Sequence, residues 1–169
     1  MEQRAKLPVR LTFRGIGSTL GIQEFINGHN NTRPIVDFEM SEIPISNEDW
    51  LTFQNRNVTV LQIPSFFGGV SFFYNLPEAG KMNLTSCLLA KVFKTEITDW
   101  AHPEILAINP GYDAYVKSQQ SLVYKRIRVA VRELGSSSAL AITEYLHGSC
   151  PEVFGEELVG SMPKWSLSK

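Results

Sequence analysis

Apolar residues recur along the chain with two different periods, and the two periods alternate. Short runs in which apolar residues alternate or follow one another predict strands. These runs are 8–13, 34–40, 58–63, 70–76 and 121–131. Between them, apolar residues recur at helical spacing after residues 18, 46, 85 and 136. Strands that alternate with helices predict an α/β fold with mostly parallel sheets and flanking helices.

The stretch 129–146 passes from a strand to a helix through a turn rich in hydroxyl groups. Arg132 follows the strand and Gly135 permits the turn. Three consecutive hydroxyl residues then begin the helix: Ser136, Ser137 and Ser138. The N–H groups of a first helical turn favour an anion, and an arginine can bind two oxygens of one oxyanion. A serine N-cap beside a surface arginine explains this stretch alone equally well.

A second stretch has the same order of strand, glycine turn, hydroxyl and helix. Residues 15–21 read G-I-G-S-T-L-G, and Ile22, Phe25 and Ile26 continue at helical spacing. One glycine-rich turn is weak evidence for an anion site. Two such turns in one chain, both leading into Ser or Thr at a helix start, make a stronger case.

The composition predicts one globular domain and excludes several classes of protein. Of the 169 residues, 43% are hydrophobic and 20% are charged, which is typical of a folded chain. The formal net charge of −1 provides no basic surface for nucleic acid. No apolar run approaches the ~20 residues of a membrane span, and residues 1–9 are too polar for a signal peptide.

Residue types that bind metals or act as nucleophiles show neither ligand spacing nor a catalytic pair. Cys87 and Cys150 make no disulfide framework or metal motif, and Cys87 lies in an apolar run that predicts a buried thiol. The three histidines are not spaced as ligands, so no metal or other cofactor is expected. An enzyme is the weakest interpretation, because no nucleophile has a base nearby in sequence.

Several separated motifs occur in an order that resembles a known family. They are G-I-G-S-T-L-G (15–21), V-D-F-E-M-S-E-I-P-I (36–45), I-P-S-F-F-G-G-V-S-F-F-Y-N-L-P (63–77), L-T-S-C-L-L-A-K-V-F-K-T-E-I-T-D-W (84–100), I-N-P-G (108–111) and R-E-L-G-S-S-S (132–138). Over roughly residues 9–165 the chain resembles the phosphate-binding proteins of ABC uptake systems. The resemblance implies a type 2 periplasmic-binding fold, in which two α/β lobes enclose a dehydrated phosphate. It also implies binding and delivery without catalysis.

A periplasmic or extracellular location follows from the same resemblance. Three N-x-S/T motifs, at Asn30, Asn57 and Asn83, favour an external location without deciding it. The absence of a signal peptide pattern in residues 1–9 leaves the location open.

The resemblance assigns phosphate-binding residues position by position. Ser18 matches the serine of the family's first glycine turn, and Arg132 matches its phosphate arginine. Glu42 stands where the family has an aspartate that accepts a proton from phosphate. The family's run of small and hydroxyl residues matches Ser136, Ser137 and Ser138.

A carboxylate at the position of Glu42 selects among anions. Two like charges ~4 Å apart repel by about 4 kcal/mol at an effective dielectric constant near 20. Hydrogen phosphate replaces this repulsion by a hydrogen bond, whereas sulfate has no proton to offer at neutral pH. The sequence therefore predicts a preference for phosphate over sulfate.

Four residues depart from the family pattern around these positions. Glu42 is one methylene longer than the family's aspartate, and Leu134 replaces an acidic neighbour of the arginine. Ser137 replaces a glycine, and Leu20 replaces a small residue. The departures leave a second hypothesis open: a degenerate binding-protein fold that serves as a structural or interaction subunit and has lost ligand binding.

The resemblance also predicts an incomplete two-lobe architecture. Residues 9–58 correspond to a partial first lobe, and residues 59–169 correspond to the second lobe. The family's opening strand and its closing segment have no counterpart in this sequence. Because an empty strand position would expose backbone groups and apolar faces, we expect either that another polypeptide completes the fold or that the chain is a shortened form or gene remnant of a larger protein.

Overall fold

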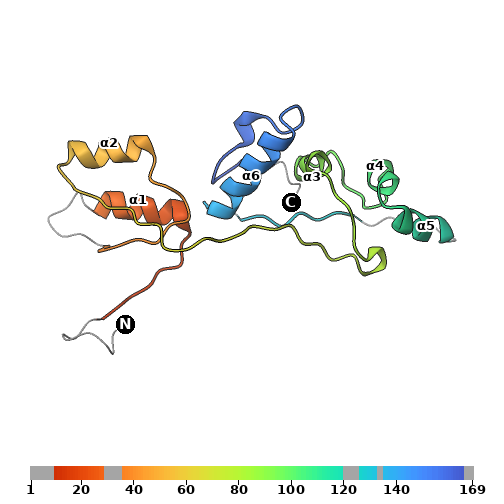
Figure 1. Ribbon diagram of the computed structural model, residues 1–169, viewed down its shortest axis with the longest axis horizontal. Coiled ribbons are helices and arrows are strands. Elements are labelled where there is room, and N and C mark those ends of the chain that lie inside the picture. The colour runs from red at the N-terminus through yellow and green to blue at the C-terminus, as the bar shows by residue number, and fades with distance from the viewer. Residues whose placement is uncertain (1–9, 29–35, 120–125, 133–134, 166–169) are drawn as a thin grey trace. The chain divides into compact units, whose positions relative to one another are not determined.

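A computed structural model describes residues 10–28, 36–119, 126–132 and 135–165 (Figure 1). The chain divides into two compact units, Met1–Val60 and Leu61–Lys169. Each unit has its own helices and its own hydrophobic core.

Unit 1 is built on two helices, α1 (Ser18–Gly28) and α2 (Asn47–Asn55). Its core joins Ile22 and Ile26 of α1 to Phe53 of α2. The two helices are also connected by the guanidinium of Arg56, whose Nη1 donates to the carbonyl oxygen of Ile26 at 2.8 Å. The Ser46 hydroxyl accepts a hydrogen bond from the backbone of Asp49 and so caps the start of α2.

Unit 2 contains four α-helices and two short 3-10 helices among its described residues. The α-helices are α3 (Ser86–Phe93), α4 (Pro103–Ala107), α5 (Pro110–Ser118) and α6 (Ser137–Ser149), and the 3-10 helices are η2 (Pro77–Ala79) and η3 (Glu156–Leu158). The Thr85 hydroxyl accepts from the backbone N–H of Leu88 at 3.2 Å and caps α3, as expected for a threonine at a helix start. The helices predicted after residues 18, 46, 85 and 136 are thus all confirmed.

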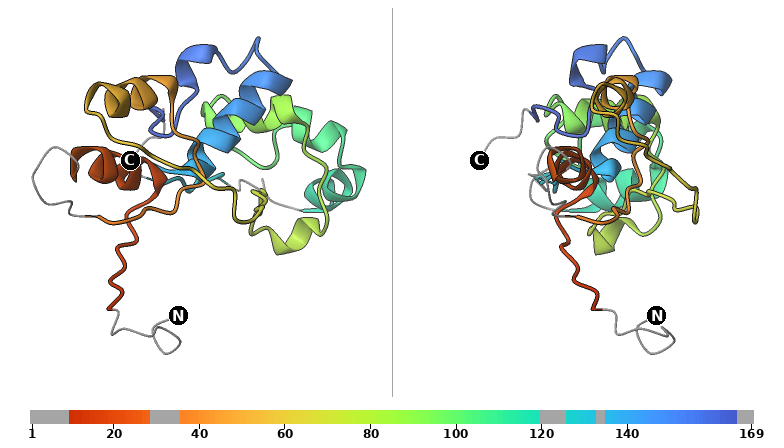
Figure 2. Two further views of the ribbon diagram at one scale, coloured as in Figure 1. Left: turned by 60° about the vertical axis from the view of Figure 1, so that its left-hand side comes forward. Right: turned by 90° about the vertical axis from the view of Figure 1, so that its left-hand side faces the viewer.

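Two hydrophobic clusters form the core of unit 2. One gathers α3, α4 and α5 around Leu88, Ile105 and Tyr112. The other lies between α3 and α6, which pack against each other (Figure 1 and Figure 2). Its buried members are Ala90, Phe93, Leu146, Cys150 and Phe154.

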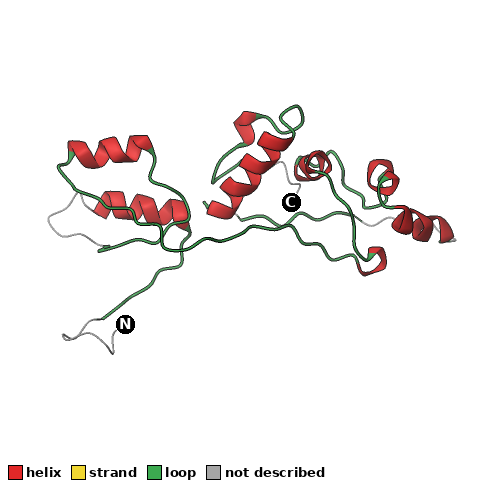
Figure 3. Cartoon of the chain, viewed as in Figure 1, coloured by secondary structure: helices red, strands yellow, loops and turns green. Residues whose placement is uncertain are grey.

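The predicted strands differ from what the structure shows. Within the described ranges no residue belongs to a β-strand, and the described parts of the expected strand segments are loops (Figure 3). Residues 8–9, 34–35 and 121–125 of these segments lie outside the described residues. An isolated antiparallel bridge joins Asp99 to Arg126. The apolar period is present in these segments, but a strand also needs a neighbour whose backbone accepts and donates hydrogen bonds. The mostly parallel sheet therefore stays a prediction.

Cys87 is not the buried free thiol that its apolar surroundings predict. It forms a disulfide with Cys150, with an S–S distance of 2.08 Å and a Cα–Cα distance of 5.3 Å. The two cysteines are 63 positions apart in sequence. They meet because α3 packs against α6, which no local pattern could reveal.

None of the helices in the described ranges combines the length and the apolar character needed to cross a bilayer.

Candidate anion site

The turn before α1 is shaped by a glycine. Gly17 has a φ of +86°, a left-handed conformation that a residue with a side chain seldom adopts. The turn places Ser18 as the first residue of α1, where it is only 9% exposed. The first turn of α1 contains no acidic residue, so the positive end of the helix dipole is not offset there by an acidic side chain of its own turn.

Ser18 and the backbone of Glu42 lie together within unit 1. The backbone N–H of Glu42 donates to the Ser18 hydroxyl oxygen at 3.3 Å. The Ser41 hydroxyl both accepts from the N–H of Ile43 and donates to its carbonyl oxygen, each at 2.9 Å. These bonds fix the backbone around Glu42, whose side chain is exposed.

The Thr19 hydroxyl is a further group that the sequence analysis did not assign. Its Oγ1 is buried and has no hydrogen-bond partner among the described residues. Burying a hydroxyl without a partner is costly. Thr19 stands directly after Ser18 in the first turn of α1, so it adds a hydroxyl to the same helix start. The motif G-I-G-S-T contained this signal, since two hydroxyl residues follow the glycine.

Glu39 is a second acidic residue near α1 that the sequence did not single out. Its carboxylate lies against Gly21 so closely that a methyl group on Gly21 would overlap it. Burial raises the pKa of the Glu39 carboxyl above its ordinary value, because a partly buried site disfavours the charged form. Only the packing of residues 36–40 on α1 could have revealed this contact.

In unit 2, the start of α6 also combines a buried serine with a first turn that contains no acidic residue. Ser136 is the N-cap and is 3% exposed, but its side chain makes no capping hydrogen bond. Its backbone N–H donates to the carbonyl oxygen of Ser161 at 2.9 Å, which ties the turn to the C-terminal segment. Ser137 and Ser138 form the first turn of α6, and that turn contains no acidic residue. The Ser136 side chain therefore does not itself cap the first-turn N–H groups.

Arg132 lies four positions before Ser136 and its side chain is exposed. No ion pair or hydrogen bond to its guanidinium occurs among the described residues. The residue that departs from the family pattern beside it, Leu134, lies outside the described ranges.

The structure thus groups the candidate residues in two sets, one in each unit. Ser18, Thr19 and Glu42 belong to unit 1. The set in unit 2 consists of Arg132, Ser136, Ser137 and Ser138. Each set combines a helix start without acidic residues and at least one buried serine, which is the chemistry of an oxyanion site.

Comparison with known proteins identifies the family. The model of the PBP superfamily domain matches residues 2–164. The chain belongs to the PBP superfamily. The resemblance read from its separated motifs is therefore confirmed.

Several relatives of this PBP superfamily chain carry the name phosphate-binding protein. Phosphate-binding protein PstS 3 of Mycobacterium tuberculosis is 30% identical over 147 residues, which cover 86% of this chain and 36% of the relative. Phosphate-binding protein PstS of Haemophilus influenzae is 30% identical over 158 residues, or 92% of this chain and 42% of the relative. That of Pasteurella multocida is 32% identical over 139 residues, or 81% and 35%. The chain therefore spans well under half the length of these relatives.

Proposed function

We propose that this chain is a phosphate-binding module of the kind used in ABC phosphate uptake. The observation that carries the proposal is the pair of helix starts at α1 and α6, each with a buried serine and neither with an acidic residue in its first turn. The names of the relatives support phosphate as the anion.

Each residue set has a defined task in this proposal. The hydroxyls of Ser18 and Thr19 and the turn Ser136–Ser138 bind phosphate oxygens together with first-turn N–H groups. Arg132 contributes a charge-assisted pair of hydrogen bonds, and its guanidinium has no competing partner among the described residues. Glu42 accepts the phosphate proton and disfavours sulfate.

The proposal includes the two lobes expected from the sequence. The division of the chain between Val60 and Leu61 supports a first lobe at 9–58 and a second lobe at 59–169. Mostly parallel sheets belong to the same proposal, since the apolar period of the expected strands remains in place and lacks only paired neighbours.

A further polypeptide that completes the fold is also part of the proposal. Residues 57–76 contain no charged side chain, and Leu61, Phe67 and Phe73 are 79%, 101% and 94% exposed. Natural proteins protect such segments by pairing, covering or charging them. Pairing with strands of the remaining binding-protein fold would cover them.

We place the protein outside the cytoplasm and assign it a binding role without catalysis. The disulfide between Cys87 and Cys150 supports an oxidising compartment, because disulfides are rare where thiols are kept reduced. The relatives are named as binding proteins, and phosphate is the only ligand that the proposal requires.

Calorimetry with two anions tests the proposed function. We expect the oxidised chain to give saturable heat with phosphate and no binding heat with sulfate at the same concentration. Arg132→Ala should weaken phosphate binding at least ~10-fold, as expected for the loss of a charge-assisted contact. The matched control is Arg128→Ala, which removes an exposed arginine from the same segment and should leave the affinity unchanged. Absence of heat at millimolar phosphate would favour the structural or interaction subunit.

A further inference from the structure

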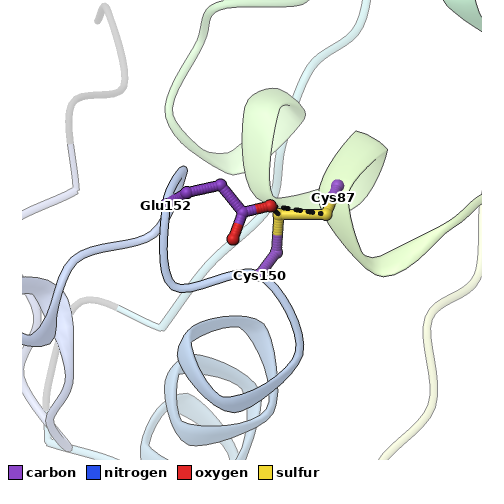
Figure 4. Close-up of side chains that lie close together, drawn as sticks. All are labelled: Cys87, Cys150 and Glu152. Atoms are coloured by element: carbon purple, nitrogen blue, oxygen red, sulfur yellow. Dashed lines mark hydrogen bonds between the residues drawn. A yellow bond between two sulfur atoms is a disulfide. The ribbon is translucent and has the colours of Figure 1, made fainter.

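A carboxylate lies directly against the disulfide that joins α3 to the end of α6 (Figure 4). Oε1 of Glu152 is 2.9 Å from Sγ of Cys150 and 3.5 Å from Sγ of Cys87. Sulfur carries no hydrogen in a disulfide, so these approaches become S–H···O hydrogen bonds only after reduction. The three groups form a compact cluster outside the candidate anion site.

The two cysteines differ in their exposure to solvent. Cys150 is fully buried, at 0% exposure, in the core between α3 and α6. Cys87, on α3, is partly exposed. Because a reductant must approach the sulfur that it attacks, the geometry favours attack on Cys87 with Cys150 as the leaving group.

We propose that the Cys87–Cys150 disulfide is a thiol–disulfide exchange site. Thiol reductants attack it at Cys87, and Glu152 slows its reduction. In the first step a reductant thiolate forms a bond to Cys87 Sγ, and the S–S bond breaks with its electron pair on Cys150 Sγ. In the second step another thiolate attacks the reductant sulfur of the mixed disulfide and releases Cys87 as a thiolate. The protein disulfide gains two electrons and, from solvent, two protons, while two reductant thiols are oxidised to one disulfide.

Glu152 opposes the thiolate that departs in the first step. Its carboxylate oxygen stands 2.9 Å from Cys150 Sγ, the sulfur on which that negative charge forms. Like charges at this separation repel, and an exposed carboxylate is partly screened by water. Glu152 therefore slows reduction without preventing it.

Reduction has a consequence for the anion site, and this part rests on the proposed function. The disulfide fixes the C-terminal end of α6 to α3, and the first turn of the same helix carries Ser137 and Ser138. Opening the disulfide frees one end of the element that positions those groups. The redox state thereby sets the affinity of the site for phosphate.

The rate at which glutathione reduces the disulfide tests whether Glu152 slows the reaction. Before reduction, a thiol-blocking reagent should label neither cysteine, and labelling of both would overturn the proposal. Glu152→Gln should be reduced about fivefold faster than the unchanged chain, the size expected for one screened charge contact. Glu144→Gln, which neutralises an exposed glutamate on α6, is the matched control and should keep the original rate. Equal rates for Glu152→Gln and the unchanged chain would overturn the proposal, and so would an equal acceleration by Glu144→Gln.

The position of the mixed disulfide tests the direction of attack. Peptide mass mapping after brief exposure to glutathione should place the adduct on Cys87, and an adduct mainly on Cys150 would contradict the geometry.

Phosphate calorimetry on oxidised and reduced chains tests the coupling to the anion site. We expect affinity at least about fivefold lower after reduction, within the usual range of coupling between sites. Equal affinities would overturn the coupling. If the oxidised chain binds no phosphate at all, the proposed function fails, whereas the exchange site is still judged by its rates and its adduct.

Discussion

Ser18 and Ser136 are buried serines at the starts of two helices that lie in different units. Both positions could be predicted from sequence, because a glycine followed by hydroxyl residues and then a helical apolar period is a local signal. The Thr19 hydroxyl is present in the same motif, whereas Glu39 could not be predicted, since its environment depends on its contact with α1. Local pattern thus predicts the helix start, and packing decides which neighbouring groups matter.

Replacing Glu42 by Gln tests its role in selecting the anion. The amide keeps the size of the side chain but removes the charge that repels a fully ionised anion. We expect the ratio of phosphate to sulfate affinity to fall at least ~10-fold, chiefly because sulfate binds better. Competition calorimetry at neutral pH measures the ratio. Glu48→Gln on α2 is the control and should leave it unchanged, and an unchanged ratio in Glu42→Gln would remove Glu42 from the site.

Replacing Glu39 by Gln tests the cost of its buried charge. Burial raises the pKa of Glu39, so the folded state binds this proton more tightly than the unfolded state does. The charge therefore costs stability above the folded pKa and costs nothing below the unfolded pKa. We expect the free energy of unfolding of Glu39→Gln, relative to the unchanged chain, to rise as the pH increases from the ordinary pKa of a glutamate through the raised pKa of the folded state. Urea unfolding across this range measures it, and a flat or falling difference would contradict the burial of the charged group.

At the scale of elements, α6 combines a predictable start with an unpredictable end. Its first residues follow from the glycine and serines of the sequence, whereas its C-cap, Cys150, is fixed by a disulfide to a helix far away in sequence. The apolar residues that recur at helical spacing after residue 85 include Leu88, Val92 and Phe93, and these three are buried. This pattern could not predict a partner for Cys87, because disulfide pairing depends on which helices pack together.

The double variant Cys87→Ser, Cys150→Ser tests how much the disulfide stabilises unit 2. Closing a loop of this length is expected to contribute about 4 kcal/mol, mainly by restricting the unfolded chain. The variant should lose about that much free energy of unfolding, measured by urea denaturation under oxidising conditions. The chain without substitutions, measured after reduction of the disulfide, is the control and should lose a similar free energy of unfolding. A loss below ~1 kcal/mol in both would show that packing of α3 on α6 suffices.

At the scale of the whole molecule, the family could be predicted from sequence but the sheet is not formed in the described residues. The apolar pattern of a strand depends only on its own residues, whereas its pairing partner belongs to another segment of the chain. Residues 61–74 illustrate this difference, because they keep the apolar character of strands while Phe67 and Phe73 are exposed. Helices satisfy their own backbone groups and therefore form without such partners.

Phe67→Asp tests the exposed segment without disturbing a core. We expect the free energy of unfolding to change by less than ~0.5 kcal/mol, because Phe67 is fully exposed. Self-association should fall, since a charge opposes pairing between exposed apolar segments. Light scattering at rising concentration measures this. The control is Gln54→Asp, which adds the same charge at an exposed position of α2. An equal fall in self-association for the two variants would contradict the claim that the exposed segment around Phe67 causes it.

The central claim is that the helix starts of α1 and α6 both bind phosphate. Amide chemical shifts during a phosphate titration of the oxidised chain test it most directly. The claim predicts that the amides of Ser18 and Thr19 and those of Ser137 and Ser138 shift as phosphate is added, and that sulfate moves neither set. Shifts confined to one helix start, or equal shifts with sulfate, would contradict it.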